Sequence, residues 1–298
     1  MAQHDPADAR RLDEHALDAV LRRLARRPEP PWLHGEIARR MAERLAVVRL
    51  QPQRVLDWWS FLGASRAVLQ QAYPKAQIVA VEPTTVLAER SRRLQRAPWW
   101  SPRRAPGVML EHDEPGEPAQ LVWANMMLHA VKDPPALMAR WQRALAADGF
   151  VMFSCLGPDT LRELRDLYAA LGWPAPMAPL VDMHDLGDML GQAGFADPVM
   201  DQETLTLHWA SPQALIEELR SLGGNVATDR AAGLRTPRWR AALEEALRAR
   251  AAPDGRIAMR FEIAYGHAFK ALPRMRTDAP TTVSLEEMRS LVRSGRRS

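Results

Sequence analysis

The stretch from Arg54 to Glu82 constrains the fold of this chain more than any other. A short apolar run ends at Asp57, a helical pattern follows from about Gly63 to Ala72, and a second apolar run, Ile78 to Val81, ends at Glu82. This order predicts a βαβ unit in a doubly wound, mostly parallel α/β sheet. Ligands bind beyond the carboxyl ends of strands in such sheets. Asp57 and Glu82 are therefore predicted to lie beside a nucleoside, with Glu82 placed to accept hydrogen bonds from ribose hydroxyls.

The same unit resembles the cofactor site of class I S-adenosylmethionine-dependent methyltransferases, whose first strand ends in Asp-x-Gly-x-Gly-x-Gly. In this sequence the pattern gives Asp57, Trp59, Phe61 and Gly63, so aromatic residues stand where two of the three glycines are expected. The resemblance implies S-adenosylmethionine as cofactor, with Asp57, Gly63 and Glu82 as binding residues. Glycine lets the backbone approach a ligand closely. Two rings there are expected to fill the pocket or to force the loop onto another path.

A longer stretch, Ala119 to Tyr168, carries a more specific resemblance. It reads as a strand ending in Asn125, an Asp-Pro helix start, a second strand and the run Gly-Pro-Asp-Thr-Leu. It is similar to the malonyl-acyl-carrier-protein O-methyltransferases of biotin synthesis, and also to a related mitochondrial assembly factor for respiratory complex I. The likeness extends from about Leu33 to Lys270. It implies a Rossmann-like class I methyltransferase sheet with N-terminal helices and an inserted helical cap.

This resemblance also implies roles for three further residues. Asp113 follows the third predicted strand, where the family places an acid near the adenine amino group, and a solvated turn acid is the alternative. Asn125 would lie beside the reacting methyl group, although a turn role is equally compatible with an amide. His129 would act as a base or bind a substrate carboxylate, but a single histidine is more often structural. Asp159 and Thr160 predict a helix start that either caps itself or receives an anion.

The chain order predicts five segments. They are an N-terminal helical lid region (1–50), the first part of the core (51–157), a core continuation with a helical cap insertion (158–256), a final core strand (257–276) and a basic flexible tail (277–298).

Composition excludes several classes of function. The single cysteine and the absence of paired histidine spacing argue against a metal site, and no long apolar run predicts a membrane span. The N-terminal residues lack a signal-peptide core, so a cytoplasmic protein is expected. Lysine occurs only at 75, 132 and 270, arginine supplies the other basic residues, and acids nearly balance them to a net charge of +4. Nucleic-acid binding is therefore not favoured.

Three hypotheses remain open from the sequence. The first is an S-adenosylmethionine-dependent O-methyltransferase acting on an acyl-carrier-protein thioester. The second is a degenerate, non-catalytic member of the fold that binds another protein or ligand as a binding or assembly factor. The third is a nucleic-acid-binding protein, although no segment resembles a dedicated recognition module.

Overall fold

The computed structural model describes residues 12–95 and 107–271. The basic tail predicted from Thr277 onward lies outside the described residues, as does the part of the predicted N-terminal segment before Leu12.

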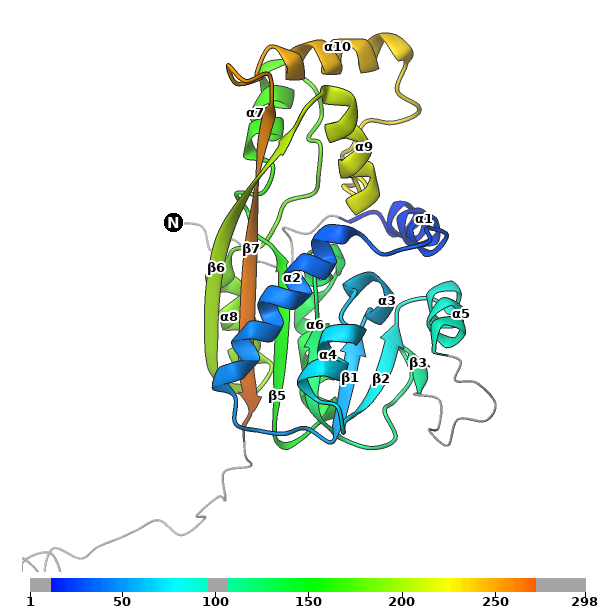
Figure 1. The fold of residues 1–298 in the computed structure, drawn as a ribbon, viewed down its shortest axis with the longest axis vertical. Helices are drawn as coiled ribbons and strands as arrows, with labels where there is room; N and C mark the ends of the chain where they lie inside the picture. Colours follow the sequence, from blue (N-terminus) through cyan, green and yellow to red (C-terminus); the bar gives the residue numbers. More distant parts are fainter. Residues whose placement is uncertain (1–11, 96–106, 272–298) are drawn as a thin grey trace, which may run out of the picture.

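Within the described residues, seven strands form one sheet in the order β3-β2-β1-β4-β5-β7-β6 (Figure 1). Strands β1 to β5 are mutually parallel, and β7 runs antiparallel to both of its neighbours. The predicted doubly wound α/β sheet is therefore confirmed. The strands are β1 (Arg54–Trp58), β2 (Gln77–Glu82), β3 (Val108–Leu110), β4 (Ala119–Ala124), β5 (Leu145–Leu156), β6 (Phe195–Trp209) and β7 (Ile257–Lys270).

Helices cover both faces of this sheet. The apolar side chains of α1, α5, α6 and α8 belong to one core cluster, and those of α2, α4, α7, α9 and α10 belong to the other. Because both faces are covered, β1, β2 and β4 are apolar on both sides instead of alternating with polar residues. The helices are α1 (Glu14–Ala25), α2 (Trp32–Glu43), α3 (Ser60–Gly63), α4 (Arg66–Ala72), α5 (Thr85–Leu94), α6 (Pro134–Ala144), α7 (Arg162–Ala170), α8 (Met183–Gln192), α9 (Pro212–Leu222) and α10 (Pro237–Arg248), with short 3-10 helices η1 (Arg44–Val47) and η2 (Leu128–Ala130).

Several helices begin where side chains can satisfy the first free backbone N–H groups. Asp13 accepts a hydrogen bond from the Ala16 N–H at 3.0 Å before α1, and Ser211 accepts one from the Ala214 N–H at 3.2 Å before α9. Pro212 occupies the first turn of α9, where its missing N–H costs nothing. Helix α9 thus lies within the segment predicted to hold the helical cap insertion (158–256).

Two helix starts differ from the sequence expectation. The helix expected from about Gly63 to Ala72 begins at Arg66 as α4, because Ala64 adopts a left-handed conformation with φ 54° and ends the separate short helix α3 at Gly63. The helix expected from Asp159 begins at Arg162, because the preceding turn bonds to β7 instead. In that turn the Asp159 N–H donates to Glu262 Oε2 at 2.6 Å, so this backbone donor is already used within the protein.

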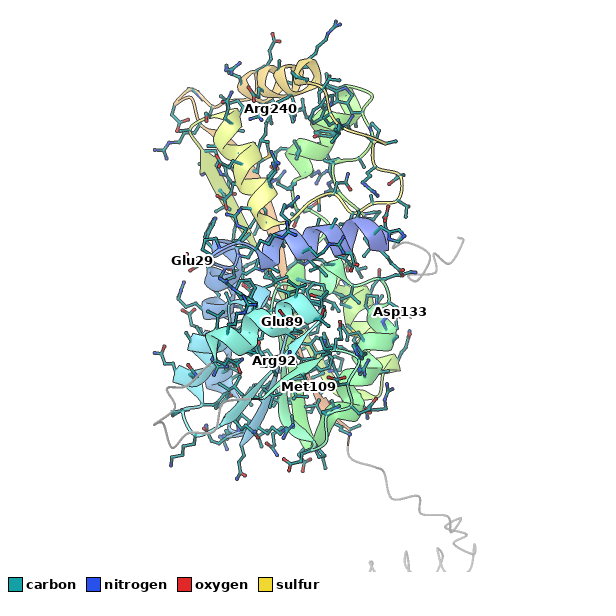
Figure 2. All side chains as sticks on the ribbon, turned by 90° about the vertical axis from the view of Figure 1, so that its right-hand side faces the viewer. Glu29, Glu89, Arg92, Met109, Asp133 and Arg240 are labelled. Carbon is teal, nitrogen blue, oxygen red and sulfur yellow. The ribbon has the colours of Figure 1, made fainter. Side chains whose placement is uncertain are left out.

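The two longest strands, β6 and β7, support a cap of helices beyond the parallel part of the sheet. Strands β6 and β7 extend past the other strands, and α7, α9 and α10 gather around the extension (Figure 1). Helix α1 lies across the junction between this cap and the sheet (Figure 2). Trp32 Nε1 donates to a carboxylate oxygen of Glu218 on α9, and Arg23 donates to the Gly223 carbonyl. These bonds join the N-terminal helices to the cap.

None of the helices within residues 12–95 and 107–271 has the length and apolar character that crossing a membrane requires.

Candidate functional site

The two predicted acids lie at the carboxyl ends of neighbouring parallel strands. Asp57 is the fourth residue of β1, Glu82 is the last residue of β2, and β1 pairs directly with β2. Both side chains are completely buried. The sequence therefore located the pair correctly, while their burial has its cause in the loop that follows β1.

The loop after β1 has the backbone conformation of a glycine turn, although a tryptophan occupies the position where the family has a glycine. Trp59 adopts a left-handed conformation with φ 55°, which costs a residue with a side chain on the order of 1–2 kcal/mol. Its N–H donates to the Val81 carbonyl at 2.7 Å, and its carbonyl accepts the Gly63 N–H at 2.8 Å. These bonds to β2 and to the next turn hold the conformation in place.

The carboxylate of Glu82 is bonded to the protein itself. Its Oε1 accepts the Phe61 backbone N–H at 2.9 Å and also the Ser91 hydroxyl of α5, while Oε2 is buried with no hydrogen-bond partner among the described residues. The Phe61 ring is buried, and the Arg90 guanidinium lies over it at 5.3 Å from the ring centroid. The Phe61 N–H and the Ser91 hydroxyl thus occupy the Glu82 oxygen that ribose hydroxyls were predicted to use.

Burial also changes the protonation of both acids. Burial raises the pKa of Glu82 to about 8, against the lowering effect of the Ser91 and Phe61 hydrogen bonds. Burial raises the pKa of Asp57 to about 7, although Ser60 Oγ donates to Asp57 Oδ2 at 2.5 Å. Near neutral pH Glu82 is therefore mainly protonated, which suits an enclosed carboxyl group and not an open hydrogen-bond acceptor for two hydroxyls.

The residues present do not fit S-adenosylmethionine in this conformation. Neither Asp57 nor Glu82 is accessible to a molecule as small as water, since each has a relative exposure of 0%. A nucleoside would need Phe61, a residue of α3, to leave its place beside Arg90 of α5.

A different acid approaches the loop from β3. Glu111 Oε1 accepts the Trp58 indole N–H at 2.7 Å, and Oε2 accepts that of Trp59 at 3.3 Å. Asp113 is about half exposed and accepts the Leu110 N–H at 2.8 Å within its own turn. Sequence reasoning missed Glu111. Its position directly after the apolar run of β3 was the available signal.

Asn125 forms a buried network at the end of β4. Its Nδ2 donates to the carbonyls of His34 at 2.7 Å and Gly63 at 2.6 Å, and its Oδ1 accepts the Ser154 hydroxyl at 2.7 Å. A Cβ on Gly63 would lie 3.4 Å from the Asn125 carbonyl oxygen, so glycine permits this close approach. The amide therefore ties α2, the β1 loop and β5 together.

Two histidines border a large cavity next to this network. His34 is buried, and burial lowers its pKa to about 4, so the ring is neutral; its Nδ1 lies 2.7 Å from the Leu62 carbonyl oxygen, to which it donates. His129 lies in η2, and its Nδ1 accepts the Leu156 N–H at 3.4 Å. The sequence could have indicated His34, because it falls beside Leu33 and one turn before Ile37 on the buried face of α2.

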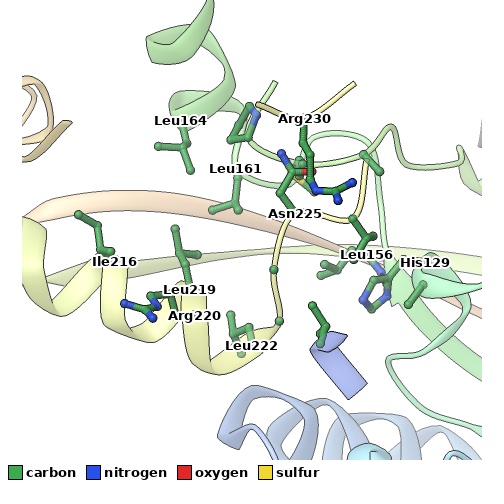
Figure 3. Close-up of a pocket in the computed structure, with 18 of the residues that line it drawn as sticks. His129, Leu156, Leu161, Leu164, Ile216, Leu219, Arg220, Leu222, Asn225 and Arg230 are labelled. Atoms are coloured by element: carbon green, nitrogen blue, oxygen red, sulfur yellow. Dashed lines mark hydrogen bonds between the residues drawn. The ribbon is translucent and has the colours of Figure 1, made fainter. Parts of the chain in front are cut away.

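The cavity lies between the strand ends and the cap and has a volume of about 710 Å³ (Figure 3). His129 borders it, together with Trp59 and Leu62 of the β1 loop. Asp57, Gly63, Glu82, Asp113 and Asn125 do not line it. The structure thus separates the predicted cofactor residues, which are enclosed or lie apart, from the predicted substrate residue His129.

Comparison with known proteins gives this geometry a family. The family described as methyltransferase domain matches residues 12–197. The malonyl-[acyl-carrier protein] O-methyltransferase of Halorhodospira halophila is 37% identical over 269 residues, covering 89% of this chain and 90% of that protein. The chain belongs to the malonyl-acyl-carrier-protein O-methyltransferase family. The Gallionella capsiferriformans methyltransferase of the same name is 35% identical, over 84% of this chain and 88% of that protein.

Solved structures agree with this family at the level of the fold. The YcgJ protein of Bacillus subtilis superposes with a TM-score of 0.52 at 11% identity, covering 80% of this chain and 99% of that chain. A putative methyltransferase from Bacillus halodurans also gives 0.52, at 14% identity, covering 78% and 99%. The class I methyltransferase architecture predicted from the sequence is therefore confirmed. Membership implies S-adenosylmethionine as the family's cofactor.

Proposed function

We propose that this member of the malonyl-acyl-carrier-protein O-methyltransferase family binds an acyl-carrier-protein thioester but does not transfer a methyl group. It acts as a non-catalytic binding or assembly factor. One observation carries this proposal: the Glu82 carboxyl group is fully buried and hydrogen-bonded to the Phe61 N–H.

The aromatic loop supports a closed cofactor site in two further ways. Trp59 and Phe61 are both buried, so their rings occupy space inside the protein instead of turning into solvent. Glu111 also holds the two indoles of Trp58 and Trp59 at the same edge of the sheet. Opening the site would require breaking these bonds and exposing two rings to water, which is costly.

The substrate half of the site supports retained binding. The family's curated relatives are named for malonyl-[acyl-carrier protein] as their substrate. The cavity beside His129 remains large, so closure of the cofactor side does not fill it. We assign the carrier-bound acyl group to this cavity.

An active O-methyltransferase is the second candidate function. It is favoured by the retained frame of Asp57, Gly63 and Glu82, and by the left-handed Trp59 backbone, which a glycine would also adopt. In that case the loop opens, Asp113 contacts the adenine, and Asn125 and His129 lie near the substrate. A carboxylate nucleophile requires only alignment with an electrophilic methyl group, so no strong base would be needed.

A methyl-transfer assay separates the two candidates. Purified protein is incubated with radiolabelled S-adenosylmethionine and a malonyl-acyl-carrier-protein thioester, and binding of the same thioester is measured by biolayer interferometry without cofactor. We expect saturable thioester binding and no label on the thioester. Repeated turnover would contradict the proposal, and absence of thioester binding would remove the binding role.

A further inference from the structure

Four arginines lie at the carboxyl end of helix α1, a helix on the face of the molecule that Figure 2 presents. They are Arg22, Arg23, Arg26 and Arg27, and all four residues are exposed. The helix dipole favours cations at this end, but like charges three or four positions apart also repel one another. An acidic partner would relieve this repulsion.

A fifth arginine joins these residues from the cap. Arg23 donates hydrogen bonds to the carbonyls of Arg220, at 3.4 Å, and Gly223, so the end of α9 lies against α1. Burial lowers the pKa of Arg23, and the neighbouring charges of Arg220 and Arg27 lower it further. The charges of two helices thus meet at one place. We call Arg23, Arg26, Arg27 and Arg220 the basic surface.

The basic surface has little compensation from acids of the protein itself. Arg26, Arg27 and Arg220 form no ion pair with any acid in residues 12–95 or 107–271. By contrast, Arg40 of the other N-terminal helix, α2, pairs with Glu36 at 2.7 Å. The positive charge at the end of α1 is therefore available to an anionic surface of another molecule.

The inner sides of the same two helices wall the cavity. Leu21 and Leu24 of α1 and Leu219 of α9 line it. Since a helix is about 10 Å across, a partner on the basic surface stands roughly one helix diameter from the cavity. A group tethered to that partner would need to span little more than this distance.

The surroundings favour a protein over a nucleic acid as the partner. Glu29 and Glu217 border a small cleft together with Arg27. These carboxylates interrupt the positive charge and would repel the evenly spaced phosphates of a nucleic acid. A protein can place basic side chains opposite the two glutamates and acidic side chains opposite the arginines.

We propose that the basic surface is the docking site of the carrier protein, which binds it through an acidic segment of its own surface. This inference rests on the proposed function in taking an acyl-carrier protein as the partner. It deepens that function by assigning the place and the charge of the contact.

Charge reversal tests the docking site in the absence of the acyl group. A labelled acyl-carrier protein without its phosphopantetheine arm is titrated with the full-length protein, and fluorescence anisotropy measures binding. Arg26→Glu/Arg27→Glu is expected to weaken binding at least about tenfold. Arg238→Glu/Arg248→Glu, exposed on α10 and outside the cavity lining, is the control with the same change in net charge. The affinity of the parent protein should fall as salt rises, and the reversed variant should lose most of this dependence.

Circular dichroism verifies the folding of each variant. Arg26→Gln/Arg27→Gln is the second variant, for the case in which acids disturb the end of α1, and is expected to weaken binding about threefold or more. Unchanged affinity in the folded variants, an equal loss in the control, or no binding of the armless carrier protein by the parent overturns the proposal. Binding of a short labelled DNA duplex that the reversed variant loses would contradict the choice of a protein partner.

A small thioester separates this proposal from the proposed function. S-malonyl-phosphopantetheine, free of carrier protein, is expected to bind the parent and the reversed variant equally, because neither Arg26 nor Arg27 lines the cavity. If it binds neither protein, the proposed acyl binding fails while docking of the armless carrier protein stands. Weaker binding of the small thioester by the reversed variant alone would show that these arginines hold the arm, which would contradict the docking assignment.

Discussion

Glu82 and Asn125 show how single polar groups fix the state of the site. Glu82 has one oxygen bonded to Phe61 and Ser91 and the other buried without a partner among the described residues. Asn125 uses its amide to join three segments that are far apart in the chain. Both are residue types expected in a cofactor and substrate site. In this structure, however, both form their hydrogen bonds with other groups of the protein.

The pH dependence of stability should reveal the enclosed Glu82. Its pKa is about 8 in the folded protein and 4.5 when solvated, so between these values the folded state holds more protons than the unfolded state. The free energy of unfolding therefore falls as pH rises through this window, with a limiting slope on the order of 1.4 kcal/mol per pH unit. Glu82→Gln keeps the acceptor for the Phe61 N–H and removes this slope. Urea denaturation from about pH 5 to pH 8 measures it.

Glu217→Gln on the exposed face of α9 serves as the control and should leave the slope unchanged. Parallel curves for the parent and Glu82→Gln would show that Glu82 is not enclosed. Asp57, whose pKa is raised to about 7, contributes a residual slope in both proteins.

Asn125→Ala should lower the free energy of unfolding by about 2–4 kcal/mol, because the buried carbonyls of His34 and Gly63 lose their donor. Gln192→Ala, on the exposed end of α8, should change it by less than about 0.5 kcal/mol. Chemical denaturation of both variants makes the comparison. Stability close to that of the parent would favour the role near the reacting methyl group that the sequence predicted for Asn125.

At the scale of elements, the loop after β1 and strand β7 each place their backbone close to a neighbouring segment. The loop crosses the strand tips with Trp59 in a left-handed conformation, and β7 passes Phe153 of β5 at Gly266. The sequence located both segments, through the Asp-x-Gly-x-Gly-x-Gly pattern and the final core strand predicted within 257–276. It did not show how the aromatic loop packs, because that depends on Ser91, Arg90 and Glu111 from other elements.

Gly266→Ala should destabilise the protein by about 1–3 kcal/mol, since the added Cβ would lie 2.4 Å from Phe153 Cζ and 2.9 Å from Met200 Sδ. Gly191→Ala is the matched control. It lies in α8 with open space around the new Cβ, and should stabilise by up to about 1 kcal/mol through helix propensity. Thermal denaturation compares them, and equal melting temperatures would contradict this packing.

At the scale of the whole molecule, the cap and the N-terminal helices enclose a cavity. Beside it, the loop after β1 covers the carboxyl ends of β1 and β2. The sequence predicted the sheet and the position of the acid pair at the strand ends, because both follow from local patterns of apolar residues and turns, and the family resemblance implied the helical cap. It could not predict the arginines at the cavity, since arginine is spread along the chain and only folding brings residues 220 to 240 beside α1 and β5. His34 was missed although its place on the apolar face of α2 was a usable signal; its bond to the Leu62 carbonyl, by contrast, is visible only in the folded chain.

Calorimetric titration of S-adenosylhomocysteine tests the closed cofactor site most directly. The parent protein is compared with Trp59→Gly/Phe61→Gly and, because removing two buried rings is costly, with Phe61→Gly alone. Near-ultraviolet circular dichroism verifies the folding of each variant. If the cofactor site is closed, the parent protein should show no saturable binding of S-adenosylhomocysteine at millimolar concentration. A folded glycine variant should then bind it at one site. One-site saturation by the parent protein would contradict it.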